Sequence, residues 1–188
     1  METPPLQCLE PKTKTGLVVV MTGDGKGKTT SALGICVRAA GYGMKVCFIQ
    51  FMKGDMYSGE IDGIKRLAPN VELNRTGKGF CGIMGNPYPY EEHRANAQEA
   101  VKLAREKTLS GNYDIIILDE INNACHLRLV DLAQVLELLD LKPPLVHMAL
   151  TGRNAPQEVI DRADTVSEIR DIKHAYRRGI EPQKGIDY

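Results

Sequence analysis

The chain contains no tryptophan, and aromatic residues make up only 5% of its 188 positions. Neither sign of charge is in excess, because 24 Lys and Arg residues are balanced by 24 Asp and Glu residues. A basic surplus is the usual electrostatic signature of a protein that binds nucleic acid or an anionic membrane, so we expect neither partner. Apolar runs long enough to cross a bilayer are also missing, and we expect no transmembrane helix.

The sequence also shows no pattern typical of a metal cluster or a catalytic triad. The five cysteines form no Cys-x-x-Cys pair and lie mostly in apolar runs, which indicates reduced thiols rather than disulfides or a zinc site. The four histidines have no metal-binding spacing, and we predict that His147 is a hydrogen-bonded core histidine. The first residues lack the basic and then apolar pattern of a secretory signal, so we expect a cytoplasmic location.

The remaining composition favours one globular domain. Hydrophobic residues make up 43% of the chain, enough for a sizeable core. Residues 1–15 contain proline and lysine without any periodicity, and we predict a flexible N-terminal arm there. Residues 16–188 are then a single domain.

Apolar runs alternate with helical patterns along this domain. The expected strands are nearly continuous apolar runs at residues 17–21, 45–51, 71–74, 115–118, 145–150 and 165–170. Amphipathic or alanine-rich stretches predict helices at residues 29–40, 91–107, 130–139 and 156–163. This alternation predicts an α/β fold with a mostly parallel central sheet and helices on both faces. Residues 76–89, rich in glycine and proline, predict an irregular loop long enough to be a lid.

The strongest motif is a glycine-rich loop between the first strand and the first helix. Such a loop directs backbone N–H groups at a polyphosphate, and the helix N-terminus adds a favourable field. Lys28 would contribute a positive charge to the phosphates, and the Thr29 hydroxyl would ligate Mg²⁺. The predicted ATP-binding residues are Gly23, Asp24, Gly25, Lys26, Gly27, Lys28, Thr29 and Thr30.

This loop is one residue shorter than the standard P-loop. Only three residues separate Gly23 from Gly27, where the standard motif has four before its Gly-Lys pair. A tighter loop can hold the phosphate chain in a different register, so γ-phosphate hydrolysis does not follow from the motif. The alternative interpretation is a flexible turn without function.

A second motif ends the fourth expected strand. Four apolar residues precede Asp119 and Glu120, and in a parallel sheet this end lies at the same edge as the glycine-rich loop. One carboxylate can bind the metal or its water, while the other hydrogen-bonds the Lys28–Thr29 turn or acts as a base. A solvated acidic turn is the plain alternative.

Other candidate ligands follow the remaining strands. Arg153 comes directly after a strand and can clamp phosphate, and Arg38 lies further along the first helix, where an ATP contact and a surface ion pair are equally plausible. Gln50 and Lys53 lie at the end of the second strand, beside the phosphate loop, and are candidates for a ligand role. Phe80, in the glycine- and proline-rich loop, either pins that loop to the body of the protein or faces a flat ligand.

These motifs together resemble the ATP:corrinoid adenosyltransferases of the CobA/CobO/BtuR type. The matching segments follow the family order and are residues 22–30, 50–54, 118–120, 151–153, 163–168, 173–176 and 184–188. The resemblance implies a RecA-like P-loop fold and a homodimer. It also implies transfer of the 5′-deoxyadenosyl group of ATP to cobalt(I) of a corrinoid, with release of triphosphate.

The resemblance assigns roles to several of these residues. Lys28, Thr29 and Glu120 would be catalytic, with Mg²⁺ held by Thr29 and by Glu120 rather than Asp119. Gln50, Lys53 and Phe80 would contact the corrinoid. The cobalt must first be reduced, which implies an electron donor such as a flavoprotein.

One departure concerns the loop that follows the third strand. Some relatives carry a Phe and Trp pair there, whereas this chain has Phe80 and Gly82. Tyr88 or Tyr90 is a candidate substitute in displacing the lower cobalt ligand. Two rival functions stay open. A P-loop ATPase or small-molecule kinase is one, since an Asp-Glu strand end also serves hydrolases, and a nucleotide-dependent corrinoid carrier without catalysis, suggested by the missing Trp, is the other.

Overall fold

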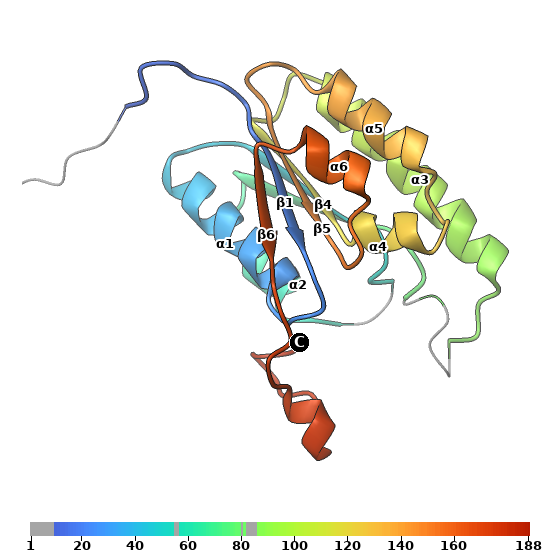
Figure 1. The fold of residues 1–188 in the computed structure, drawn as a ribbon. Coiled ribbons are helices and arrows are strands. Elements are labelled where there is room, and N and C mark those ends of the chain that lie inside the picture. Colours follow the sequence, from blue (N-terminus) through green and yellow to red (C-terminus); the bar gives the residue numbers. More distant parts are fainter. Residues whose placement is uncertain (1–9, 55–56, 80, 82–85) are drawn as a thin grey trace, which may run out of the picture.

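Strands and helices alternate along the chain, as predicted from the apolar runs. The computed structural model describes residues 10–54, 57–79, 81 and 86–188 (Figure 1). In chain order, the elements are β1 (Val18–Thr22), α1 (Lys28–Gly41), β2 (Val46–Gln50), α2 (Glu60–Lys65), β3 (Val71–Arg75), α3 (Tyr90–Leu109), β4 (Ile115–Asp119), α4 (Ile121–His126), α5 (Leu132–Leu141), β5 (His147–Thr151), α6 (Gln157–Arg162), β6 (Thr165–Glu168) and the 3-10 helix η1 (Ala175–Arg178).

The strands form one parallel sheet in the order β3-β2-β4-β5-β1-β6. Every residue of β2 and β4 is buried, because these central strands have neighbours on both sides and helices above and below. All four residues of β6 are exposed, because this strand lies at the edge. The predicted α/β class and parallel sheet are therefore confirmed.

Helices cover both faces of the sheet, as predicted (Figure 1). On one face, Ala32 and Cys36 of α1 and Ile64 of α2 pack with apolar side chains of the sheet. On the other face, α3, α4, α5 and α6 bury a larger cluster that includes Ala104 and Leu138. Small alanines on the buried side of α3 let this long helix lie close to the strands.

Three short elements were not predicted: α2, α4 and η1. Each has only four to six residues, too few for a helical periodicity to be visible in the sequence. The six strands and the four predicted helices, α1, α3, α5 and the six-residue α6, begin and end within two residues of their predicted positions. The Gly/Pro segment contains no helix or strand at its described residues 76–79, 81 and 86–89.

The prediction for His147 was only partly right. The ring nitrogen Nδ1 accepts a hydrogen bond of 3.1 Å from the Leu17 N–H, so the side chain is satisfied. The residue is half-buried at the start of β5 rather than part of the core. Among the described cysteines, Cys36, Cys47, Cys81 and Cys125 are free thiols, as predicted.

The carboxyl ends of the parallel strands bring the predicted motifs to one edge of the sheet. Thr22 leads into the glycine-rich loop, Asp119 ends β4, and Thr151 ends β5. Residues 10–15 form no helix or strand and are exposed, while the rest of the predicted arm lies outside the described residues. Within the part of the chain that the structure describes, no helix combines the length and apolar content needed to cross a membrane.

Candidate functional site

The glycine-rich loop joins β1 to α1 and presents the N-terminus of that helix. Gly23 and Gly27 have φ angles of 93° and 124°, which favour glycine because a side chain would strain this backbone. Gly27 caps the helix, and its first turn contains no acidic residue. The unbonded N–H groups of this turn therefore form an anion-binding site of the predicted kind.

Lys28 bends back over this loop. Its Nζ donates hydrogen bonds to the carbonyl oxygens of Gly23 at 2.7 Å and Gly25 at 2.8 Å. Burial lowers the pKa of Lys28 and outweighs the opposing negative charge of Glu120. The loop thus holds a buried cation at the place where an anion would bind.

Asp119 is the carboxylate that bonds the Lys28–Thr29 turn. Its Oδ1 accepts hydrogen bonds from the hydroxyls of Thr29 at 2.9 Å and Thr151 at 2.7 Å. Its Oδ2 lies 3.5 Å from Nε2 of Gln50. The side chain is completely buried, and burial raises its pKa. The prediction that one carboxylate of this pair would bond the turn is confirmed.

Glu120 takes a different position. It has a left-handed backbone with φ of 65°, its N–H donates to the Thr151 hydroxyl at 2.9 Å, and its side chain lines the cavity beside the loop. Burial, and then the charge of Asp119, raise the pKa of Glu120. Asp119 is engaged in its own hydrogen bonds and does not line the cavity, so Glu120 is the carboxylate of this pair at the cavity surface.

The hydroxyl of Thr29 and the carboxylate of Glu120 are oxygen ligands of the kind that Mg²⁺ prefers. This ion binds few protein carboxylates and completes its coordination shell with phosphates and water. Within the described residues, no group of three or more His, Cys, Asp or Glu side chains is arranged to hold a metal. Thr29 and Glu120 both line the cavity, so the residues present fit a metal that also takes ligands from phosphate and water.

The cavity beside the loop has a volume of about 790 Å³, within the range of small-molecule sites. One wall is the glycine-rich loop, and a second comprises Lys53 and Glu60. Its more apolar lining includes Leu33, Met52, Cys81, Leu127 and Ile186. The predicted loop residues Asp24 to Thr30, together with Lys53, Glu120 and Arg153, therefore share one cavity.

Every Lys and Arg side chain among the described lining residues has a protein partner. Arg153 lies 3.8 Å from the carboxylate of Asp24 through its Nε, and both side chains are exposed. Lys26 pairs with Asp187 at 2.8 Å, and Lys53 pairs with Glu60 at 3.4 Å. Lys28, in turn, is bonded to the loop carbonyls of Gly23 and Gly25.

The structure does not bring all predicted residues to the cavity. Arg38 is exposed in the last turn of α1 and does not line it. Gln50 is completely buried between Asp119 and Glu60 and also does not line it. The phenyl ring expected to contact the corrinoid, Phe80, lies outside the described residues, as does Gly82.

The lining residues that the sequence analysis missed include Glu60 and a set near the C-terminal end of the sequence. Glu60 begins α2, a helix too short to be predicted, although it lies seven positions beyond Lys53 in the same segment. The tail, defined as residues 169–188, crosses the loop, where the Gly25 N–H donates to the Ile169 carbonyl at 2.7 Å. His174, Gly185, Ile186, Asp187 and Tyr188 of this tail complete the cavity wall.

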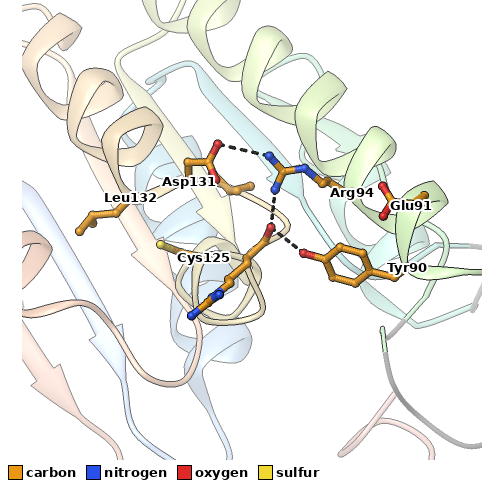
Figure 2. Close-up of a pocket in the computed structure, with 8 residues that line it drawn as sticks. Tyr90, Glu91, Arg94, Cys125, Asp131 and Leu132 are labelled. Atoms are coloured by element: carbon orange, nitrogen blue, oxygen red, sulfur yellow. Dashed lines mark hydrogen bonds and ion pairs between the residues drawn. The ribbon is translucent and has the colours of Figure 1, made fainter.

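A second hollow of about 570 Å³ lies between the start of α3 and the turn from α4 to α5 (Figure 2). The Tyr90 hydroxyl and the Arg94 guanidinium both donate to the Arg128 carbonyl, at 2.8 and 2.6 Å. Arg94 also pairs with Asp131 at 3.3 Å. These polar groups are hydrogen-bonded to one another. We therefore interpret them as contacts that hold α3 against the turn between α4 and α5, and not as a ligand site.

Comparison with known proteins identifies the family of this chain. The family model described as ATP:corrinoid adenosyltransferase BtuR/CobO/CobP matches residues 14–188. The corrinoid adenosyltransferase of Pseudomonas aeruginosa is 35% identical over 173 residues, covering 92% of this chain and 84% of the relative. The corrinoid adenosyltransferase of Escherichia coli K12 is 36% identical over 174 residues, covering 92% and 86%.

Among solved structures, the ATPase EscN of the enteropathogenic E. coli type III secretion system is similar with a TM-score of 0.50. Its identity is 16%, and the match covers 81% of this chain and 42% of EscN, so it supports the fold alone. The family model and the two sequence relatives, in contrast, span nearly the whole chain. This chain therefore belongs to the ATP:corrinoid adenosyltransferase family.

Proposed function

We propose that this protein transfers the 5′-deoxyadenosyl group of ATP to cobalt(I) of a corrinoid and releases triphosphate. The observation that carries the proposal is that the short phosphate loop, with Lys28, and Glu120 line one cavity, in a chain that belongs to this family. Family membership supports the reaction, and the cavity supports the assignment of residues to it.

In this reaction, the electron pair of cobalt(I) attacks C5′ of the ribose. A cobalt–carbon bond forms, the C5′–O bond breaks, and its electron pair leaves with the triphosphate. Because cobalt(I) is a strong nucleophile, the step requires no general base. The protein contributes mainly by orienting C5′ towards cobalt, and well-oriented reactants gain about 7–11 kcal/mol.

The second contribution is electrostatic. Negative charge grows on the departing triphosphate, and the N–H groups of the loop and the Lys28 ammonium stabilise it. Asp119 positions the Thr29 hydroxyl at the head of α1. Arg153, now beside Asp24, is close enough to the loop to exchange that partner for a phosphate. Mg²⁺, bound by Thr29 and Glu120, would supply further positive charge to the leaving group.

We assign the corrinoid to the more apolar side of the same cavity. Met52, Cys81 and Leu127 line it there, and such side chains favour a cobalt that has lost its lower ligand. Phe80, the predicted aromatic contact, lies near Cys81 in the sequence. Of the candidate substitutes for the missing tryptophan, Tyr90 is engaged with the Arg128 carbonyl, and Tyr88 lies edge-on to His93 with ring centroids 6.4 Å apart.

We further propose that the protein works as a homodimer in the cytoplasm and receives electrons from a donor such as a flavoprotein. The exposed edge strand β6 and the exposed tail side chains Ile172 and Tyr176 support association, since such surfaces are usually covered. Sedimentation of the purified chain tests the dimer.

The decisive experiment is a product assay with Mg-ATP and chemically reduced corrinoid, both complete cobalamin and an incomplete corrinoid. We expect one triphosphate to be released for each cobalt–carbon bond formed, with the bond measured by its absorbance. ADP and phosphate formed without corrinoid would instead support a P-loop ATPase, and phosphorylation of an added small molecule would support a kinase. Binding of both substrates without turnover would support a carrier.

A further inference from the structure

Glu60 is a cavity carboxylate that the mechanism above does not use. It is the first residue of α2, its side chain is only 9% exposed, and it lines the same cavity as Lys28 and Glu120. Its Oε1 lies 3.4 Å from Nζ of Lys53 and 3.4 Å from Nε2 of Gln50. These two long contacts help to hold the carboxylate in place, with the Ser58 side chain and a backbone N–H also acting on it.

The carboxylate keeps capacity for further donors. An ionised carboxylate offers about four acceptor positions on its two oxygens, and the Lys53 and Gln50 contacts involve only Oε1. Burial by itself would raise the pKa of Glu60, but the neighbouring Ser58 hydroxyl and a backbone N–H, followed by the charge of Lys53 and the contact with Gln50, outweigh it and keep the pKa below its usual value. Glu60 is therefore an ionised acceptor at the cavity wall.

The position of Glu60 relative to the loop restricts what it can bind. Gln50 connects Glu60 to Asp119, and Asp119 bonds Thr29 at the start of α1. Glu60 is thus near the phosphate end of the cavity, where an isolated carboxylate would repel ATP. The donors that ATP offers are the two ribose hydroxyls and the adenine amino group, and the ribose is the part that adjoins the phosphates.

The tail limits the space beside Glu60. A Cβ atom built on the neighbouring Gly59 would lie 4.0 Å from the carbonyl carbon and oxygen of Tyr188. Since Ile186 and Asp187 also line the cavity, the α2 wall and the tail enclose a compartment next to the phosphate loop. A sugar is a suitable occupant, because it needs a polar acceptor on one side and tight packing around it.

We propose that Glu60 is the ribose-binding residue, accepting hydrogen bonds from the 2′- and 3′-hydroxyl groups of ATP and thereby fixing the orientation of C5′. Carboxylates bind ribose hydroxyls in the same way in other nucleotide sites. This inference deepens the proposed adenosyl transfer and rests on it. Gln50 and Lys53 then act as positioning residues for Glu60.

The test is equilibrium binding by calorimetry with the full chain and no corrinoid, so its result does not depend on adenosyl transfer. The ligands are the magnesium complexes of ATP, 2′-deoxy-ATP, 3′-deoxy-ATP and inorganic tripolyphosphate. The variants are Glu60→Gln and, as a matched control, Glu99→Gln, an exposed α3 residue paired with Lys102.

We expect Glu60→Gln to weaken ATP binding about tenfold or more, because hydrogen bonds to a charged group are lost. Tripolyphosphate has no sugar, so its affinity should be unchanged, which also shows that the variant is folded. Each deoxy nucleotide should bind more weakly than ATP to the native protein, and Glu60→Gln should weaken the deoxy nucleotides less than ATP. Glu99→Gln should behave as the native protein.

Two results would overturn the proposal. Equal weakening of tripolyphosphate and ATP in Glu60→Gln would mean that Glu60 acts on the phosphates through Lys53. Native affinities that are the same for ATP and both deoxy nucleotides would exclude a contact with the ribose, whether or not the variant folds. If the native protein bound ATP more tightly than the deoxy nucleotides but formed no product with reduced corrinoid, that result would instead count against the proposed function.

Discussion

Lys28 is the cation that the loop holds most closely. Its Nζ is bonded to two carbonyls of the loop, and only 7% of the residue is exposed. We expect Lys28→Ala to lower kcat/KM about a hundredfold or more, since a preorganised charge is removed from the leaving group. Initial rates of cobalt–carbon bond formation measure this effect.

The matched control is Lys102→Ala, because Lys102 is 73% exposed on α3, away from the cavity. It should retain native activity. Both variants should unfold cooperatively, because Lys28 makes its hydrogen bonds at a cavity rather than in the core. Full activity in Lys28→Ala would remove this residue from the mechanism.

His147 predicts a pH dependence of stability. Burial, and then the positive charge of Lys142, lower its pKa from 6.5. The unfolded chain therefore binds more protons than the folded protein between the two pKa values. The contribution of His147 is complete above its unfolded pKa and is lost as the pH falls through the lower, folded pKa.

The substitution His147→Asn removes the titrating group and keeps an acceptor for the Leu17 N–H. We expect its free energy of unfolding to fall less than that of the native protein between about pH 7 and pH 5. Urea unfolding at several pH values measures this difference. The same substitution at the exposed His126 is the control, and identical pH profiles for His147→Asn and the native protein would contradict the prediction.

At the scale of elements, the glycine-rich loop and the tail depend on close backbone contact. A Cβ on Gly25 would lie 2.7 Å from the carbonyl oxygens of both Ile169 and Arg170. Neither backbone atom can rotate away, so Gly25→Ala requires the tail to move. We expect the free energy of unfolding to fall by about 1–3 kcal/mol, as for other overpacked sites.

The same change at Gly34 should have the opposite sign. Gly34 lies within α1, and a Cβ there would meet nothing within 4 Å. Gly34→Ala should therefore stabilise the protein by about 0.5–1 kcal/mol, because alanine loses less backbone entropy in a helix. Urea unfolding compares the two variants, and a native stability for Gly25→Ala would show that the tail does not rest on the loop in solution.

Short elements also explain what was missed. The six residues of α2 include Gly63 and provide one buried side chain, Ile64. Such a segment has no helical pattern to recognise, and it forms because Ile64 packs with β3 and its neighbours. Glu60 owes its place in the cavity to this packing, which is why it was not identified from the sequence.

For the whole molecule, we expect bound ligand to stabilise a single cooperative unit. At a concentration of about 100 times Kd, Mg-ATP should add about 2.7 kcal/mol to the free energy of unfolding. For a chain of this size, that corresponds to an increase in Tm of about 5–10 °C. Thermal unfolding followed by circular dichroism measures it.

Magnesium tripolyphosphate should produce most of this shift, and adenosine little, because the loop binds phosphate through charge and N–H groups. A shift with adenosine but none with tripolyphosphate would contradict the phosphate-loop assignment. This comparison uses the native chain and needs no corrinoid.

Much of the molecule was predictable because its signals are local. The apolar runs that became β2 and β4, the glycines before Lys28, and the two carboxylates at the end of β4 are each local features of the sequence. Parallel strands then place such motifs at one edge of a sheet, so the contact between Thr29 and Asp119 followed from topology. The resemblance of the ordered motifs to one enzyme family was visible for the same reason.

Other features depend on contacts between segments that are far apart in sequence. No local sequence pattern indicates three of these features. They are the pairing of Lys26 with Asp187, the burial of Gln50 between two carboxylates, and the position of Arg38 outside the cavity. The sequence by itself determined the α/β architecture, the phosphate loop and the family, since these depend on short-range periodicity and spacing. Only the tertiary structure decided which charged side chains meet in the cavity, because that depends on how α2 and the tail pack against the loop.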